Sequence, residues 1–99
     1  MAIESHNIPV ISTPHLTVDV AEALTNQRNN NPWAPCADWE HGFFLCLERI
    51  GRHCGEPVAA PRCLSDIREW LIDNGFNSCW VRLDSDGPTV GDLPSYEWP

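Results

Sequence analysis

The segment at residues 41–48 (HGFFLCLE) constrains the fold of this chain more than any other part of its sequence. Successive side chains of an extended strand point to opposite faces. Here both faces are apolar, with Phe43, Leu45 and Leu47 on one and Phe44 and Cys46 on the other. Strands of this kind are typical of the interior of a sheet that is covered on both sides. The pattern therefore predicts a central strand with a layered core around it.

Two other segments are predicted strands. Residues 8–12 (IPVIS) include Pro9, which lacks an amide proton and therefore belongs at an edge of the sheet or at the start of the strand. Residues 78–83 (SCWVRL) place Cys79, Val81 and Leu83 on one face. Residues 32–41 (PWAPCADWEH) are rich in proline and tryptophan, and we expect them to be irregular.

Two helices are expected between these strands. The first begins after Thr17, which can cap the first backbone amides, and ends in the polar run 26–31 (NQRNNN). The second begins at Pro61 or at a Ser65 cap and ends at Asn74, before Gly75. The buried faces would carry Val20, Ala21 and Leu24 in the first helix and Ile67, Trp70 and Leu71 in the second.

These elements predict one α/β (α+β) domain over residues 1–99. Its order would be β-α-β-α-β, with the two helices mainly on one face of a small sheet and an extended C-terminal tail after residue 83. Residues 89–90 and 96–98 of the tail could add an edge strand or pack across the sheet. A chain of 99 residues buries only about two-thirds of its unfolded surface, and five tryptophans add buried area per residue.

The charge of the chain narrows the classes of partner. The chain has fourteen acidic residues, six arginines and no lysine, which gives a net charge of −8. Binding to bare nucleic acid or to an anionic membrane requires cations, so neither is expected. Acidity can serve solubility alone, or it can steer the chain toward a basic protein surface. No apolar run of about 18 residues and no export signal is present, so we expect a cytoplasmic protein with reduced thiols.

The cysteine-rich middle of the chain could suggest a metal or a nucleophile. Within 28 residues lie six potential ligands: Cys36, His41, Cys46, His53, Cys54 and Cys63. None of them forms the close C-x2-C pair that is usual in structural zinc sites, so we expect no metal and no other cofactor. Cys54 stands beside Arg52 and His53, but no neighbouring base and oxyanion site accompany it. We therefore do not expect an enzyme, although a small thiol- or metal-dependent enzyme remains an alternative.

Two other positions are candidates for contact with a partner or for a purely structural role. His15 lies between a strand and a helix cap, where it could carry a proton, contact a partner or hold the start of the helix by hydrogen bonds. In the tail, acidic and aromatic side chains could form an interface, or the aromatic rings could simply pack the tail onto the sheet. The predicted partner-binding residues are Asp84, Asp86, Asp92, Tyr96 and Trp98, with Asp38 and Glu40 as a second group.

Segments at both ends of the chain carry a family resemblance. Residues 10–17 (VISTPHLT), 74–75 (NG), 79–84 (CWVRLD) and 92–98 (DLPSYEW) resemble an uncharacterised family of short bacterial proteins, classed as a domain of unknown function. Such proteins are similar to those carried by plasmids, phages and integrative elements, often beside genes that blunt restriction or CRISPR defence, and the resemblance implies such a context for this chain. The cysteine-rich stretch at residues 36–63 departs from the pattern. The resemblance supplies no catalytic residues.

Together, the resemblance and the acidic composition favour an anti-defence protein of a mobile element, of the anti-CRISPR or anti-restriction type. Its expected partner is a host protein, or a protein–nucleic-acid complex, with a basic surface. A regulatory or antitoxin-like protein-binding module is the alternative within the class of binding proteins.

Overall fold

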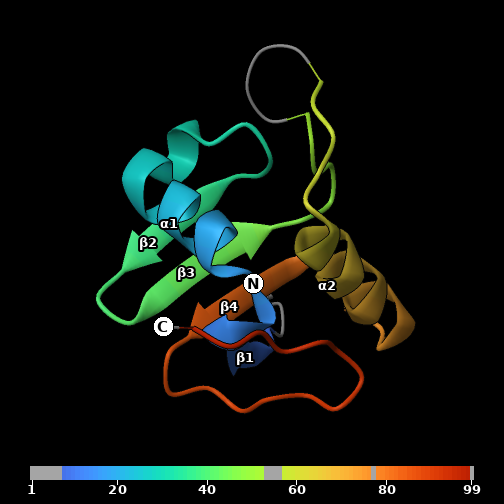
Figure 1. Cartoon of the computed structure of the whole chain (residues 1–99). Helices are drawn as coiled ribbons and strands as arrows, with labels where there is room; N and C mark the ends of the chain where they lie inside the picture. The colour runs from blue at the N-terminus through green and yellow to red at the C-terminus, as the bar shows by residue number, and fades with distance from the viewer. Residues whose placement is uncertain (1–7, 53–56, 77, 99) are drawn as a thin grey trace, which may run out of the picture.

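The computed structural model describes residues 8–52, 57–76 and 78–98, with the side chains at positions 38 and 39 excepted. Two α-helices, two short 3-10 helices and four strands follow one another along this part of the chain (Figure 1). In chain order they are β1 Val10–Ser12, η1 Thr13–His15, α1 Val18–Gln27, η2 Arg28–Asn30, β2 Cys36–Trp39, β3 Gly42–Cys46, α2 Arg62–Asp73 and β4 Trp80–Asp84. The predicted mixed α+β class is confirmed.

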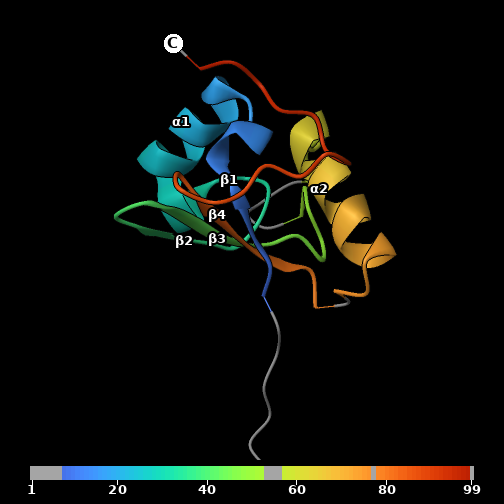
Figure 2. The ribbon, with the colours of Figure 1, turned by 90° about the horizontal axis from the view of Figure 1, so that it is seen from below.

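The four strands form one mixed sheet in the order β1-β4-β3-β2. Segments far apart in the sequence are neighbours in this sheet, because β1 pairs with β4 in parallel, with Val10 opposite Arg82. Strand β3 is antiparallel to both of its neighbours and lies inside the sheet, as its apolar pattern predicts. Helices α1 and α2 both lie on one face of the sheet, and the C-terminal tail runs along the β1 edge and past the two helices (Figures 1 and 2).

The core lies between the two helices and the sheet face that they cover. Inward-facing side chains of β3 and β4 meet the buried faces of both helices, and all of them are almost inaccessible to solvent. The set includes Ile11, Phe43, Leu45, Val81 and Leu83 from the sheet, and Val20, Leu24, Leu64, Ile67 and Leu71 from the helices. Burial of each such side chain contributes about 1.5–3 kcal/mol, so this layer carries most of the stability.

The opposite face of the sheet is more open than the sequence predicts. Phe44 and Cys46 are only half-buried, and no helix among the described residues covers them. The Arg82 guanidinium lies 5.7 Å from the centre of the Phe44 ring and shields it in part. The prediction that β3 is covered on both sides was therefore wrong for one face.

Strand β2 lies in residues 32–41, which the sequence indicated as irregular. It forms a hairpin with β3, in which Ala37 faces Phe44 and Trp39 faces Gly42. The Asn29 Oδ1 atom accepts a hydrogen bond from the Cys36 amide at 3.0 Å, so a side chain satisfies the first outward donor of this edge strand. The strand is short and follows Pro35, which explains why no alternating pattern could develop.

The helix ends differ from the sequence prediction in detail. Thr17 occupies the N-cap position of α1, but its side chain makes no capping hydrogen bond. Helix α2 begins right after Pro61, not at Ser65, and Gly75 follows it in the left-handed conformation with φ 84°. Trp70 is not a core residue. It is half-buried and stacks on Phe76, with ring centres 6.1 Å apart.

His15 fastens the tail to the rest of the molecule. Its imidazole is buried, at 2% exposure. The Nδ1 atom donates to the Pro94 carbonyl at 2.8 Å, and Nε2 accepts from the Val90 amide at 2.9 Å. The structure shows a structural role for His15, but its hydrogen bonds hold the tail and not, as predicted, the start of the helix. In the described part of the chain, no helix has the length and apolarity needed to cross a membrane.

Candidate functional site

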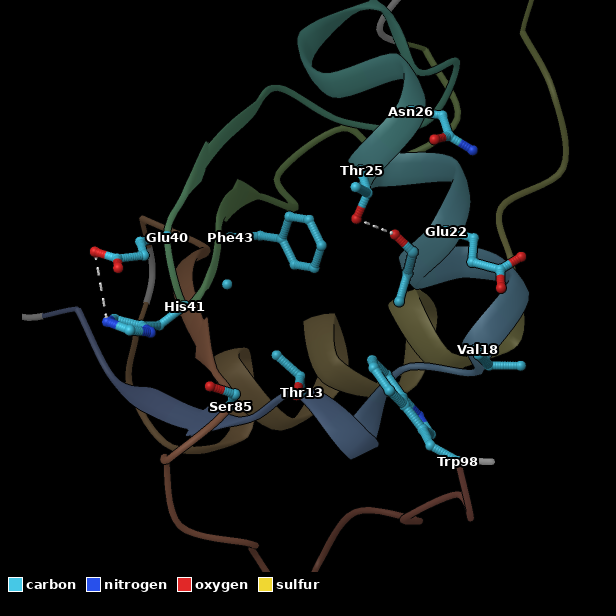
Figure 3. Close-up of a pocket in the computed structure, with 12 residues that line it drawn as sticks. Thr13, Val18, Glu22, Thr25, Asn26, Glu40, His41, Phe43, Ser85 and Trp98 are labelled. Carbon is cyan, nitrogen blue, oxygen red and sulfur yellow. Dashed lines mark hydrogen bonds and ion pairs between the residues drawn. The ribbon is translucent and has the colours of Figure 1, made fainter.

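A pocket of about 310 Å³ opens between α1, the β2–β3 turn and the C-terminal tail (Figure 3). Thr13 and Ser85 line it, and they directly follow the parallel strands β1 and β4. The pocket therefore lies beyond the carboxyl ends of the two parallel strands, which is the place where sheets of this kind commonly bind ligands.

Aromatic and aliphatic groups form the interior of the pocket. Phe43 points into it from β3, and α1 contributes Val18 and Ala21. Trp98 closes the pocket from the tail and remains 39% exposed. Its indole Nε1 donates to the Leu16 carbonyl at 3.1 Å, and this hydrogen bond holds the ring in place.

Polar groups surround this apolar interior. Glu22 on α1 and Glu40 in the β2–β3 turn are exposed and lie on opposite sides of the pocket in Figure 3. His41 lies beside Glu40, with 3.8 Å between its Nε2 and the carboxylate. The Thr25 hydroxyl donates within α1 to the Ala21 carbonyl at 2.9 Å. Both carboxylates point away from the pocket interior in Figure 3, so the pocket is apolar inside and has one negative charge on each side of its mouth. Such a pocket suits a ligand that is apolar along its length and cationic at its end, with a carboxylate on one side turning toward the cation.

The acidic residues of the tail do not form one surface. Asp84 is largely buried and forms an ion pair with Arg82 at 3.1 Å. Its other oxygen accepts from the Asp86 amide at 2.9 Å, so Asp84 is engaged within the chain. Asp86 is exposed in the same turn, whereas Asp92 lies in a separate hollow beside α2 with Arg62 and Trp70.

The two aromatic residues of the tail lie in different places. Tyr96 is half-buried, its amide donates to the Pro14 carbonyl at 2.8 Å, and its ring lines a hollow with Trp33. Trp98 instead shares the first pocket with Glu40, a residue of the second predicted group. Asp38 is in β2, but its side chain is outside the described part of the structure. Of the seven predicted residues, the pocket thus joins Glu40 and Trp98.

The candidate metal ligands are dispersed in the fold. Cys36 and Cys63 are buried, Cys46 is half-buried and His41 is exposed, while His53 and Cys54 are outside the described residues. Among the described residues, no group of three histidine, cysteine or acidic side chains could hold a metal ion. Burial raises the pKa of the Cys79 thiol above its ordinary value of 9.0, and Arg68 opposes this shift in part.

Sequence reasoning did not predict the rest of the pocket. Glu22 and Thr25, one turn apart on α1, were not predicted as site residues. Phe43 was predicted only as a residue of a strand and not as part of a pocket. The available signal was the position of Thr13 directly after a predicted strand, since such positions often carry functional groups in α/β folds. The other side of the pocket is formed by Glu40 and His41 in the β2–β3 turn. This turn could not be predicted, because strand β2 was not predicted.

Comparison with known proteins gives one match. The model described as "Family of unknown function (DUF5983) C-terminal domain" matches residues 8–98. No curated protein and no solved structure matches the chain. The resemblance to an uncharacterised family, first noted at the two ends of the sequence, thus extends over nearly the whole chain. The match covers the sheet, both helices and the tail, and the chain therefore belongs to the DUF5983 family.

Proposed function

We propose that this protein is a binding module that covers a basic surface of a host defence complex, as an accessory protein of a mobile element would. The observation that carries the proposal is the pocket that joins Glu22, Glu40 and Trp98 in a chain of net charge −8. In this proposal the pocket receives an arginine or lysine side chain of the partner. The net negative charge of the chain would attract the other cations of that surface.

The chemistry of the pocket fits such a side chain. The alkyl part would lie along Phe43 and Trp98, where it leaves water. The cationic end would lie near one carboxylate of the rim, Glu22 or Glu40, whose exposed side chain would turn toward it to form charge-assisted hydrogen bonds. The Trp98 indole can add a cation–π contact of about 0.5–2 kcal/mol. A net charge of −8 would also speed the encounter with a basic surface.

The test begins with capture of the partner from host lysate and its identification by mass spectrometry. Binding kinetics with the purified partner then compare two double variants that each remove two negative charges. Glu22→Gln with Glu40→Gln changes the pocket, and Glu69→Gln with Asp73→Asn changes exposed acids on α2. We expect the pocket variant to bind at least about tenfold more weakly, while the control loses about threefold or less.

Occlusion is tested in the same system. The wild-type protein should compete with the nucleic acid or substrate that the partner normally binds, and the pocket variant should compete poorly. Equal losses in the two double variants would assign the effect to net charge and exclude the pocket. A partner that binds the wild-type chain without losing its own activity would contradict the inhibitory function.

A further inference from the structure

A second cavity has the opposite electrostatic character to the first. It measures about 670 Å³ and lies between the loop after β3 and helix α2. Its lining includes Arg49, Arg52 and Arg68, which are three of the six arginines of the chain, together with Glu48 and Ile50. In a protein of net charge −8, half of all the cationic side chains therefore line one cavity.

The loop that carries two of these arginines is fixed by backbone hydrogen bonds. The Leu47 amide donates to the Cys79 carbonyl at 2.8 Å, which anchors the start of the loop to the chain entering β4. Gly51 donates to the Trp33 carbonyl at 2.7 Å and adopts φ 85°. A Cβ atom at Gly51 would lie 2.4 Å from the Val58 carbonyl oxygen, so the close approach requires glycine. The positions of Arg49 and Arg52 are thus built into the fold.

Arg68 supplies a donor that lacks an acceptor. Among the described residues, its Nε atom is buried and makes no hydrogen bond. Arg62 and Arg82 have carboxylate partners, at 3.9 Å from Asp66 and 3.1 Å from Asp84, although the Arg82 Nε atom is likewise buried without a hydrogen bond to the described part of the chain. Arg68 forms no ion pair with the described residues. Because its Nε atom is closed to solvent, a ligand in the cavity would contact the terminal nitrogens of the Arg68 guanidinium.

We propose that this cavity binds the phosphate group of a small molecule. Guanidinium groups present planar pairs of donors that match the oxygens of phosphate, and the three arginines outnumber the one carboxylate of the described lining, Glu48, which opposes an anion. A nucleic acid fits less well, because its binding proteins usually make about 6–10 phosphate contacts, whereas this cavity offers three cations. The phosphate can be free or esterified, and the cavity has room beside Ile50 for the organic part of an ester.

The experiment is calorimetric titration of the whole chain with inorganic phosphate, pyrophosphate and adenosine 5′-monophosphate. We expect saturable binding with about one site per chain. Arg68→Gln should weaken it about tenfold or more, which corresponds to about 1.4 kcal/mol. The matched control is Arg62→Gln on the same helix, which removes the same charge outside the cavity and should change affinity by less than about twofold.

Each outcome decides the proposal. Tighter binding of the nucleotide than of inorganic phosphate supports a phosphate ester as the ligand, and equal binding supports recognition of the phosphate group alone. Absence of saturable binding, or equal losses in Arg68→Gln and Arg62→Gln, would overturn the site. Preferential binding of duplex DNA, with an affinity that falls steeply with salt, would overturn the assignment to a small ligand.

A second variant covers the case in which Arg68→Gln fails to fold. Arg49 and Arg52 are exposed, so their joint replacement by Gln should leave the fold intact and still weaken binding. The pocket variant Glu22→Gln with Glu40→Gln should bind phosphate as the wild type does. Since this assay needs no protein partner, failure of the phosphate site and failure of the proposed function are distinguishable.

Discussion

Replacement of His15 by Ala should destabilise the fold by about 3–5 kcal/mol. The change removes the acceptor of the Val90 amide and the donor to the Pro94 carbonyl, at 2.9 and 2.8 Å. A backbone group left without a partner costs about 1–3 kcal/mol, and two of them are affected. Loss of the buried ring adds a cavity at a site that is 2% exposed. The total is a large fraction of the stability of a small domain, which is about 5–15 kcal/mol.

The assay is urea unfolding followed by circular dichroism, with His41→Ala as the matched control. His41 is an exposed histidine, and its loss should change the unfolding free energy by less than about 0.5 kcal/mol. Hydrogen exchange of the Val90 amide adds a local measurement. Release of the tail should accelerate this exchange well beyond that of amides in β3, because the tail can detach before the sheet unfolds.

Two results would contradict this role of His15. If His15→Ala and His41→Ala shift the unfolding free energy equally, the two hydrogen bonds of His15 contribute no net stability. If Val90 exchange is also unchanged, His15 does not hold the tail. The wall of the pocket formed by Trp98 would then depend on other contacts, of which the hydrogen bond from its indole to Leu16 is the first to test.

Two further predictions concern the loop after α1 and the thiol before β4. Asn31→Ala should lower the free energy of unfolding in urea by about 3–4 kcal/mol, because this fully buried side chain forms hydrogen bonds with four backbone groups of residues 28, 33 and 34. The control is Asn30→Ala at the exposed neighbouring position, which should lower it by less than about 0.5 kcal/mol. Equal losses in the two variants would contradict the role of Asn31. Burial raises the pKa of Cys79, so the folded state keeps this proton longer than the unfolded chain does, and the contribution is lost as pH rises past about 9. The unfolding free energy measured at pH 7 and pH 10 should therefore fall more for the wild type than for Cys79→Ala, and parallel curves would refute the linkage.

The elements of the core were predictable because their apolar patterns are continuous or repeat. Strand β3 lies in a continuous apolar run, and both helices present apolar side chains at helical spacing over two or more turns. The alternating burial of β3 is seen only in the structure. Strand β2 has only four residues after a proline, which is too short for a period to emerge. Strand β2 forms because it pairs with β3, and this pairing depends on the tertiary structure and not on the local sequence.

The side chains with the largest polar roles could not be recognised from local sequence. The run 26–31 correctly predicts a helix end, but nothing in it distinguishes the buried Asn31 from the exposed Asn30. Asn31 differs from Asn30 because the loop brings the carbonyl groups of Arg28 and Ala34 within hydrogen-bonding distance of its side-chain amide. The pocket also depends on the tertiary structure. Glu40 and Trp98 line the same pocket because β3 pairs with β4 and the tail returns to Leu16.

The C-terminal tail links the protection of the sheet to the construction of the pocket. Strand β1 is an edge strand, and its Ser12 amide donates to the Pro88 carbonyl at 2.9 Å, so the tail satisfies a donor that would otherwise be open to another chain. This approach is close, because a Cβ atom at Gly87 would lie 2.8 Å from the Ile11 carbonyl oxygen. From there the tail passes His15 and ends with Trp98 at the pocket. The contacts that shield the β1 edge therefore also direct the indole ring to the rim where the carboxylates lie.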